Sequence, residues 1–365
     1  MKVCFMGLTG YQLLRGDKQQ AVVGPDVYQV LLARELLKHG FKVVYINYDE
    51  GGPPVENIDG IEVIKIYPVD NSLNLLQKAI TIGKAMKKAD ADIYFQQGGA
   101  GPLTPLFCRL TGKKCVISIG HDAYVDKSIR RGSGFTFNFK TALEIRLAHV
   151  LLVLSETQKA MLKKNFGREG IVTGIHTPLP PCDMPQKTQP PMVLWVGTVY
   201  PRKQPELFLE LARAIPQVSF QMVGGATDEG YVKAVKEKAK AIPNLELTGF
   251  IPYDQINDYF SRASVFVSTA TSEGFPNVFI QAWMNYTPVV SLNIDPDDVI
   301  KRYKLGFHSG TFEQMVKDVQ VLLADEKLRR WMGSNCRRYT EENNDIKQLV
   351  KKHIEVFKRL VRPYS

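Results

Sequence analysis

The sequence lacks any apolar stretch long enough to cross a membrane as a helix. Such a helix needs about 20 predominantly apolar residues, whereas a typical long run here, residues 150–154, has only five. The first seven residues hold one lysine, a short apolar run and a glycine. A signal peptide needs a longer apolar region and a small-residue cleavage site. We therefore predict a strand at this position and a cytoplasmic protein.

Cysteine is sparse, and its spacing excludes two further classes of protein. The chain has five cysteines in 365 residues, with no CxxC and no Cys/His grouping of the zinc-binding kind. An odd, scattered set in a chain of this size argues against a disulfide framework. These residues are Cys4, Cys108, Cys115, Cys182 and Cys336.

Positive charge is in excess and lies mainly in the first half of the chain. The formal net charge is +10; residues 1–180 hold 23 Lys and Arg against 16 Asp and Glu, and the remainder holds 24 against 21. Such a balance favours an anionic partner, which can be a nucleotide, a phospholipid surface or a nucleic acid. The alternative is a solvated basic surface with no specific partner.

Short β-branched runs alternate with amphipathic helical stretches, and this alternation predicts parallel α/β sheets. Six strands and five helices are expected before residue 173. Six prolines in residues 173–191 then interrupt the pattern, and it restarts at Met192. We predict two Rossmann-like, doubly wound domains, with ligands in an interdomain cleft beyond the carboxyl ends of the strands. Their expected limits are 1–177 and 178–344, and residues 345–365 return to the first domain.

The expected strands of the first half are 2–7, 42–47, 61–66, 92–95, 114–119 and 149–154, and its helices are 26–39, 73–89, 101–111, 134–147 and 156–165. The expected strands of the second half are 192–196, 218–223, 245–248, 264–268 and 288–291, and its helices are 203–214, 228–241, 252–262, 276–285, 311–324 and 326–341.

A basic amphipathic stretch at residues 346–361 has two interpretations. Its apolar face fits a helix on a membrane surface. Terminal helices of this kind more often pack on a domain, and we favour that interpretation.

The segment most informative about function follows the strand at 264–268. Glu273 and Gly274 lie in a loop, and Pro276 is well placed in the first turn of the next helix because its missing N–H is not needed there. The free amides and positive dipole end of such a helix can hold a diphosphate. Glu273 can accept hydrogen bonds from sugar hydroxyls, and Gln281 lies more than one turn into the helix.

This segment, from Glu273 to Ala282, resembles the E-x7-E region of retaining GT-B glycosyltransferases of family 4. The resemblance implies that Glu273 contacts the donor sugar and that the following backbone holds the diphosphate. It also implies that Gln281, where the family usually has a second glutamate, contacts the nucleotide ribose. The donor-binding residues expected in this segment are Gly274, Phe275, Pro276, Asn277, Val278 and Gln281.

The resemblance extends to the loop after the strand at 192–196. Gly197 matches a family glycine, Thr198 replaces the usual arginine, and Lys203 matches a lysine that opens the next helix. Arg202 then supplies the missing charge. Cations here can offset the charge that grows on a departing nucleoside diphosphate. Without a ligand, this would be a solvated Arg–Lys pair.

Two further groups of residues complete the site that the resemblance implies. Gly249, Phe250 and Ile251 end a strand beside the expected nucleotide base, although a plain turn is equally consistent with them. In the first half, His121 follows a strand and is the candidate sugar contact, with Asp122 able to orient it. Gly24, after Val23, resembles the family's glycine turn near the diphosphate.

Residues 130–140 mix basic and aromatic side chains. This composition fits contact with an anionic lipid surface or a lipid-linked acceptor. The alternative is a loop that leads into a core helix.

The resemblance implies a metal-independent enzyme with no cofactor, whose co-substrate is a nucleoside-diphosphate sugar and whose acceptor is a glycan, a lipid-linked molecule or a small molecule. No Asp-x-Asp motif lies at the expected site, since Asp295-Pro296-Asp297 opens a helix elsewhere. We expect no specific nucleic acid partner and consider peripheral contact with an anionic membrane. A nucleotide-sugar epimerase of the same fold, or a catalytically weakened membrane- or nucleic-acid-binding relative, are the alternatives.

Overall fold

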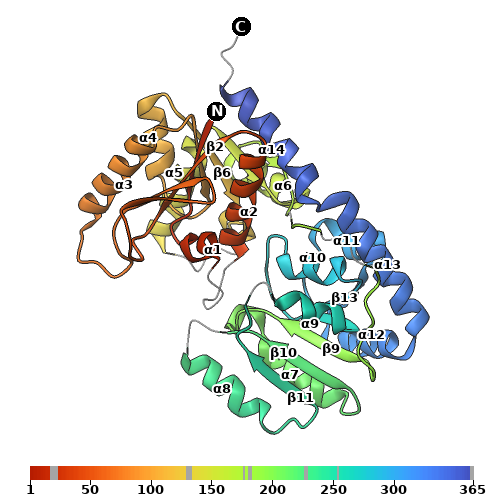
Figure 1. Ribbon diagram of the computed structural model, residues 1–365. Coiled ribbons are helices and arrows are strands. Elements are labelled where there is room, and N and C mark those ends of the chain that lie inside the picture. Colours follow the sequence, from red (N-terminus) through yellow and green to blue (C-terminus); the bar gives the residue numbers. More distant parts are fainter. Residues whose placement is uncertain are drawn as a thin grey trace. The chain divides into compact units, whose positions relative to one another are not determined.

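The computed structural model describes residues 1–16, 24–128, 134–175, 177–179, 183–225, 229–252 and 255–361. The chain divides into two compact units (Figure 1). The first unit contains the described residues up to Thr177 together with those from Ile346 onward, and the second lies within Pro178–Asp345.

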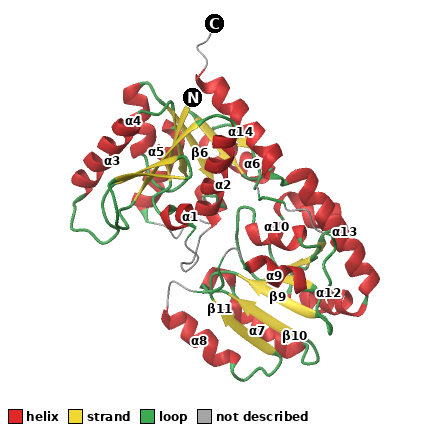
Figure 2. Cartoon of the chain, viewed as in Figure 1, coloured by secondary structure: helices red, strands yellow, loops and turns green. Residues whose placement is uncertain are grey.

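The described residues of the first unit form an eight-stranded sheet covered by helices (Figure 2). The strands are β1 (Lys2–Met6), β2 (Lys42–Asn47), β3 (Val55–Ile58), β4 (Ile61–Lys65), β5 (Ile93–Gln97), β6 (Lys114–Ile119), β7 (Val150–Val153) and β8 (Ile171–Val172). The helices are α1 (Tyr11–Arg15), α2 (Gly24–Lys38), α3 (Leu75–Ala89), α4 (Leu103–Thr111), α5 (Phe135–Leu147), α6 (Glu156–Phe166) and α14 (Ile346–Val361).

The strand order is β3-β4-β2-β1-β5-β6-β7-β8, and every pair except β3–β4 is parallel. The predicted parallel α/β architecture is confirmed. Two short strands and α1 were not predicted. β3 is half-exposed and ends in the Asp59–Gly60 turn, where both residues have positive φ, and β8 has only two residues. Neither strand carries the buried apolar run that identified the others.

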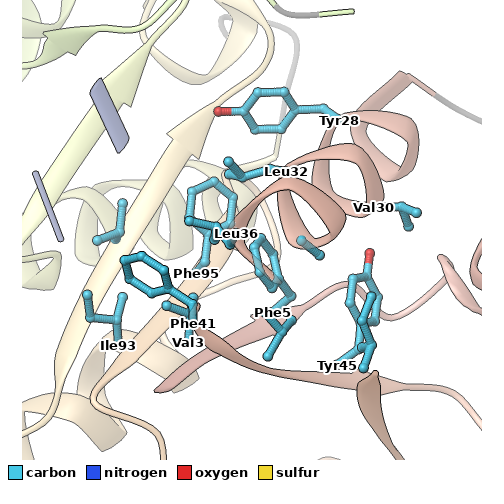
Figure 3. Close-up of a cluster of buried hydrophobic side chains, with 14 of the residues drawn as sticks. Val3, Phe5, Tyr28, Val30, Leu32, Leu36, Phe41, Tyr45, Ile93 and Phe95 are labelled. Atoms are coloured by element: carbon cyan, nitrogen blue, oxygen red, sulfur yellow. The ribbon is translucent and has the colours of Figure 1, made fainter. Parts of the chain in front are cut away.

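Side chains of the first sheet alternate between two hydrophobic cores, as the two-residue period of a strand requires. Val3 and Phe5 of β1 point to the face covered by α1, α2 and α14, whereas Cys4 and Met6 point to the face covered by α3 to α6. The first of these cores appears in Figure 3, where Phe5, Phe95 and Leu36 lie together. Burial on both faces explains why the central strands are almost continuously apolar.

Helix α14 completes the first core. Val350, His353 and Phe357 are fully buried, and the Tyr28 hydroxyl on α2 is hydrogen-bonded to His353 Nε2 at 2.7 Å. The Phe357 ring meets Phe95 of β5 edge-on, with centroids 6.4 Å apart. The apolar face of this helix is therefore occupied by its own domain, as in the packing interpretation that the sequence favours.

The second unit repeats the same architecture on a smaller sheet. Its strands are β9 (Met192–Val196), β10 (Ser219–Val223), β11 (Leu245–Gly249), β12 (Val265–Ser268), β13 (Val289–Ser291) and β14 (Gly306–His308). Its helices are α7 (Pro205–Ala214), α8 (Glu229–Ala239), α9 (Ile256–Arg262), α10 (Asn277–Met284), α11 (Val299–Tyr303), α12 (Phe312–Ala324) and α13 (Glu326–Asn343).

The described strands of this unit have the order β11-β10-β9-β12-β13-β14 and are all parallel. β10 and β11 therefore lie on one side of the β9–β12 pair, and β13 and β14 lie on the other. Strand β14 and helix α11, which the sequence did not predict, are short. Gly306 is required in β14, because a Cβ there would lie 1.9 Å from the carbonyl oxygen of Val289.

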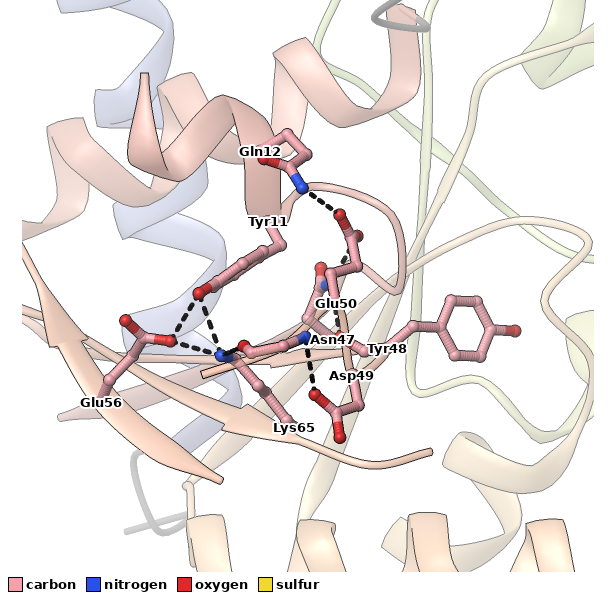
Figure 4. A network of polar contacts seen from close by, with 9 residues as sticks. Tyr11, Gln12, Asn47, Tyr48, Asp49, Glu50, Glu56 and Lys65 are labelled. Carbon is pink, nitrogen blue, oxygen red and sulfur yellow. Dashed lines mark hydrogen bonds and ion pairs between the residues drawn. The ribbon is translucent and has the colours of Figure 1, made fainter. Parts of the chain in front are cut away.

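A network of polar contacts joins α1 to the β3–β4 edge of the first unit (Figure 4). Lys65 Nζ, at the end of β4, contacts Glu56 Oε1 at 2.6 Å and donates hydrogen bonds to the Tyr11 hydroxyl at 2.9 Å and to the carbonyl oxygen of Gly51. The Lys65 side chain is 1% exposed. Three acceptors thus satisfy the three donors of a buried ammonium group.

Candidate active site

The second sheet reverses its strand order between β9 and β12. In open α/β sheets, ligands bind beyond the carboxyl ends of the strands at such a switch point, because the loops on its two sides diverge there. The loop after β9 carries Arg202 and Lys203, and the loop after β12 carries Glu273. The topology thus brings together two segments about 70 residues apart in the sequence, within the loops where a ligand is expected.

The loop after β9 is held by backbone hydrogen bonds to its neighbour. The amide of Gly197 donates to Val223 O at 3.0 Å, and that of Val199 donates to Gly225 O at 2.9 Å. The short helix η3 (Pro201–Lys203) follows, and Gln204, with a φ of 46°, separates it from α7. The prediction that Lys203 opens the next helix is therefore wrong. The backbone at Gln204 is left-handed, so η3 ends there and a separate helix, α7, starts at Pro205.

The loops after β9 and β12 are joined by a threonine. Thr269 Oγ1 donates a hydrogen bond to Lys203 O at 2.6 Å and accepts one from Trp195 Nε1 at 3.1 Å. The amide of Thr271 also donates to Arg202 O at 2.9 Å. Trp195 and Thr269 are both almost completely buried. These contacts fix the backbone on either side of the candidate site, although neither Trp195 nor Thr269 stands out in the sequence.

Lys203 and Glu273 form an ion pair across the switch point, with Nζ and Oε1 2.5 Å apart. Their side chains are 20% and 15% exposed. Partial burial removes much of the screening by water and strengthens the attraction. Among the described residues, Glu273 is the only ion-pair partner of Lys203. A lysine ammonium has three donors, so this pair retains capacity to bind a polar ligand.

Arg202 directly precedes Lys203 in the chain but is held differently. Its guanidinium carbon lies 5.6 Å from the centroid of the Tyr200 ring. Its buried Nε has no hydrogen-bond partner among the described residues. Thr198, where an arginine was expected from the resemblance, is exposed. Arg202 is therefore a cation of this loop that lies over the Tyr200 ring and has no carboxylate in ion-pair contact among the described residues.

Helix α10 begins immediately after the Glu273 loop. Pro276 has an extended backbone (φ −68°, ψ 122°) and precedes the first helical residue, Asn277. The prediction of Pro276 within the first turn is thus wrong by one position. Asn277 and Val278 are half-buried, so the start of the helix remains accessible, and its unpaired amides suit an anion.

The apolar residues of this segment anchor the loop. Gly274, Phe275 and Pro276 are buried, and the Phe275 ring meets Trp283 edge-on at 6.2 Å. Gln281 is 7% exposed, and its carbonyl oxygen accepts a hydrogen bond from Asn285 Nδ2 at 2.8 Å. Because Gly274, Phe275 and Pro276 are buried, any contact that they make with a sugar donor would have to come from backbone atoms.

The loops after β10 and β11 lie close to the loop after β9. The amide of Gly224 donates to Gly249 O at 2.9 Å, and a Cβ on Gly224 would lie 1.8 Å from Gly197 O. Gly249 has a φ of 79°, while Phe250 and Ile251 are partly exposed. Gly224 therefore permits a close backbone approach that any side chain would prevent.

The site residues expected in the first half lie at the carboxyl edge of the first sheet. His121 follows β6 and caps the short helix η1 (Asp122–Tyr124), with Nδ1 accepting a hydrogen bond from the amide of Ala123 at 2.8 Å. This bond fixes the neutral tautomer with its proton on Nε2. Asp122 Oδ1 accepts a hydrogen bond from Gln158 Nε2 at 2.9 Å. A backbone amide thus helps to orient His121, and an orienting role for Asp122 stays a prediction.

The glycine turn before α2 is described only in part. Gly24 begins the helix, and Val23 lies outside the described residues. Asp26, in the first turn, accepts hydrogen bonds from Thr9 Oγ1 at 2.9 and 3.0 Å. Burial raises the pKa of this carboxyl group, and the bond from Thr9 opposes the rise. Of the basic stretch at 130–140, residues 130–133 also lie outside the described part.

Glu144 is a polar residue that the sequence analysis did not select. It lies on α5, is 1% exposed, and accepts hydrogen bonds from Gln96 Nε2 at 2.5 Å and from the amide of Gly99 at 3.0 Å. Burial raises its pKa to about 7, although these hydrogen bonds oppose the rise. The sequence offers one signal for this residue, since Glu144 is the only acidic residue of α5.

Neither a metal site nor a membrane span emerges from the described residues. Within them, no three His, Cys, Asp or Glu side chains are grouped so as to hold a metal ion. No described helix combines the length and apolar character needed to cross a membrane.

Comparisons with known proteins agree with this geometry. Residues 183–339 match the family model of glycosyl transferases group 1. An uncharacterized glycosyltransferase of Haemophilus influenzae is 24% identical over 87% of this chain and 92% of its own length. The sucrose-phosphate synthase structure from Thermosynechococcus elongatus superposes with a TM-score of 0.80 and 16% identity, covering 99% of each chain.

The structure of Anabaena HepE in complex with UDP and glucose superposes with a TM-score of 0.74 and 15% identity, covering 98% of this chain and 100% of that one. At such identities these structures establish the fold alone. The Lys203–Glu273 ion pair lies within the segment that matches the family model. The match to the glycosyl transferases group 1 family thus covers residues 183–339, and the chain is a glycosyltransferase with the two α/β units of the GT-B fold.

Proposed function

We propose that the chain transfers a sugar from a nucleoside-diphosphate sugar to an acceptor hydroxyl with retention of anomeric configuration. The observation that carries this proposal is the Lys203–Glu273 ion pair at the β9–β12 switch point. A carboxylate and a cation held 2.5 Å apart match the two parts of the donor, since one binds hydroxyls and the other binds phosphate.

Each residue then has a distinct task. Glu273 accepts hydrogen bonds from the donor sugar, while Lys203, Arg202 and the start of α10 bind the diphosphate. In the reaction, the bond between the anomeric carbon and the phosphate oxygen breaks and a bond to the acceptor oxygen forms. The acceptor attacks from the face that the diphosphate leaves, and its proton passes to a phosphate oxygen. Preorganised cations stabilise the charge that develops on the leaving group.

The nucleotide part of the donor is proposed to lie against the glycine-rich loops of the second unit. Gly197, Gly249, Phe250 and Ile251 offer backbone groups there, and Gln281 offers an uncharged amide to the ribose. Because the HepE structure contains UDP and glucose, UDP-glucose is the first donor to test. His121 and Gly24 stay predictions, each to be tested by its own variant.

The experiment compares two Lys–Glu ion pairs in the same protein. Purified chain is mixed with a panel of nucleoside-diphosphate sugars, and both thermal shift and donor hydrolysis are measured. Glu273→Gln and Lys203→Met are expected to lower turnover about 10²–10³-fold, the usual loss for one preorganised group. The control variants Glu237→Gln and Lys240→Met remove an exposed ion pair of 2.7 Å on α8 and its following turn.

The proposal fails if no nucleoside-diphosphate sugar raises the melting temperature of the wild-type chain. It also fails if the control variants lose as much turnover as the site variants. Nuclear magnetic resonance reports the anomer released first, and an inverted product would exclude retention. A chelator should leave turnover unchanged if Lys203 and Arg202 supply the positive charge. Epimerisation of the donor without transfer would indicate an epimerase, and binding without turnover would indicate a catalytically weakened relative.

A further inference from the structure

The outer surface of α3, α4 and α5 exposes large apolar side chains. The three helices cover one face of the first sheet and share a core that includes Met86, Cys108 and Ile145. Their opposite sides face solvent, and α3 and α4 are seen beside the first sheet in Figure 1. We define the α3–α5 surface by its most exposed apolar residues: Leu75, Leu76, Ile80, Leu110, Phe135 and Phe139.

The degree of exposure separates this surface from the second unit. Phe135, Leu75 and Leu110 are 85%, 80% and 78% exposed. The largest value among the apolar residues described in the second unit is 52%, at Trp331. Phe135 and Phe139 also stack on one another, with ring centroids 6.2 Å apart and planes 16° apart. Exposed apolar side chains on three helices that cover one face of the sheet are candidates for an interaction site.

The charge on the same helices is of one sign. Helix α3 has four lysines and no acidic residue, α4 has Arg109 and no acidic residue, and α5 has Lys140 and Arg146. The one acid within these three helices, Glu144, points into the protein and is 1% exposed. Lys84, Lys87 and Lys88 are exposed and form no ion pair with any described residue. The surface is therefore apolar and cationic at once.

We propose that the α3–α5 surface binds the headgroup region of an anionic phospholipid membrane. Exposed Phe and Leu side chains insert among the headgroups and upper acyl chains, while lysines attract the negative lipids. A second copy of the chain fits poorly, because pairing this face with itself opposes two positive surfaces. A protein partner also fits poorly, since lysine is depleted in protein interfaces. This inference is independent of the glycosyl transfer proposed above.

The test is co-sedimentation of the whole chain with vesicles of phosphatidylcholine, alone or mixed with phosphatidylglycerol. The wild-type chain is expected to bind the mixed vesicles and to leave them at high salt, because screening weakens surface electrostatics. Loss of three lysines in Lys84→Ala/Lys87→Ala/Lys88→Ala should weaken binding on the order of a hundredfold. Phe135→Glu/Phe139→Glu should weaken it by at least roughly tenfold, since each ring loses its apolar contact.

Matched variants of the second unit serve as controls. Trp331→Glu changes an exposed apolar residue, and Lys233→Ala/Lys236→Ala removes two exposed lysines of α8. Both should bind mixed vesicles as the wild type does, and circular dichroism should report the same fold for all variants.

Three results would overturn the proposal. The first is a wild-type chain that binds neither kind of vesicle, or binds both equally. The second is equal loss of binding in the control variants. The third is a wild-type dimer that Leu110→Glu converts to a monomer, because the surface would then be an interface between copies of the chain. Vesicle binding requires no donor sugar, so its failure leaves the glycosyl transfer unaffected.

Discussion

The two units each hold a Lys–Glu ion pair at the carboxyl edge of a sheet, but the pairs are built for different purposes. In the first unit, Lys65 contacts Glu56, Tyr11 and the Gly51 carbonyl, so all three of its donors are used. In the second unit, Lys203 has Glu273 as its only described ion-pair partner, and both side chains are partly exposed. A saturated pair stabilises its surroundings, whereas an unsaturated pair at a switch point is available to a ligand.

The pKa directions in the first unit show what a cationic partner does for a carboxylate. The hydrogen bond from Lys65 lowers the pKa of Glu56, and that from Tyr11 adds to the effect. Burial lowers the pKa of Lys65, but Glu56 and Tyr11 reverse the change and raise it overall. Glu144 has no cation in contact within the part of the chain that the structure describes, and burial raises its pKa to about 7. The pKa values of the two carboxyl groups therefore shift in opposite directions, down where Lys65 is the partner and up where burial dominates.

The largest expected effect follows from Lys65→Met. Removal of the buried ammonium leaves Glu56 and the Gly51 carbonyl without their partner, and breaking such a pair costs about 3 kcal/mol of unfolding free energy. Urea unfolding of the first unit, followed by hydrogen exchange in residues 51–65, measures this loss. A second variant, Lys65→Met/Glu56→Leu, should recover part of it because no charge is then left unpaired. A single variant as stable as wild type would remove the distinction between the two pairs.

The next effect concerns Lys203→Met. Turnover should fall about 10²–10³-fold, while the free energy of unfolding should change by less than about 1 kcal/mol because the ion pair is partly solvated. Steady-state kinetics and urea unfolding of the same preparation measure both quantities. A large loss of stability with unchanged turnover would assign the Lys203–Glu273 pair a structural role like that of Lys65.

The raised pKa of Glu144 predicts that the stability of the first unit depends on pH. Its folded-state pKa of about 7 lies above the ordinary value of 4.5, so the folded state holds the proton more tightly. The contribution is therefore present below pH 4.5 and is lost as the pH rises through about 7. The loss amounts to roughly 3 kcal/mol at 1.36 kcal/mol per pKa unit.

Hydrogen exchange in residues 96–101, which include the Gly99 amide held by Glu144, measures this change between pH 4.5 and 8. Protection in the wild type should decrease across the window after correction for the intrinsic exchange rate. Glu144→Gln, which keeps an oxygen acceptor and cannot ionise, should show no such decrease. The same decrease in both proteins would show that another group titrates.

The smallest effect is expected for Lys240→Met. Lys240 and Glu237 are 71% and 56% exposed, and an ion pair in that position contributes less than about 0.5 kcal/mol. Neither the unfolding midpoint nor turnover should change measurably. A loss comparable to that of Lys203→Met would mean that any surface cation affects turnover, and the comparison between the pairs would no longer hold.

The sequence identified the parts of the candidate site but not how they meet. Lys203 and Glu273 were selected separately, from motifs about 70 residues apart, and their contact depends on the adjacency of β9 and β12. Strand adjacency is a tertiary property that local hydrophobic pattern does not encode. Trp195 and Thr269, which hold the two loops together, looked like ordinary residues of a buried strand and its end.

The fold was more accessible to prediction than its polar interior. Long apolar runs identified the central strands because both faces of each sheet are buried. Lys65 lies near the end of the strand predicted at 61–66 and would ordinarily be assigned to solvent. Its partner Glu56 comes from β3, a strand too short and exposed to be detected. Glu144 likewise acquires its role only when α5 is placed against the loop after β5. Buried polar contacts of this kind depend on packing between distant segments.

The return of α14 to the first unit has a consequence for biosynthesis. Helix α14 completes a core whose members outside that helix all lie before residue 178, so residues 178–345 must be synthesised in between. At typical rates of synthesis this takes roughly 10–30 s. During that interval the apolar face of α2 has no covering helix. The nascent first unit is therefore a natural client for chaperones on the ribosome.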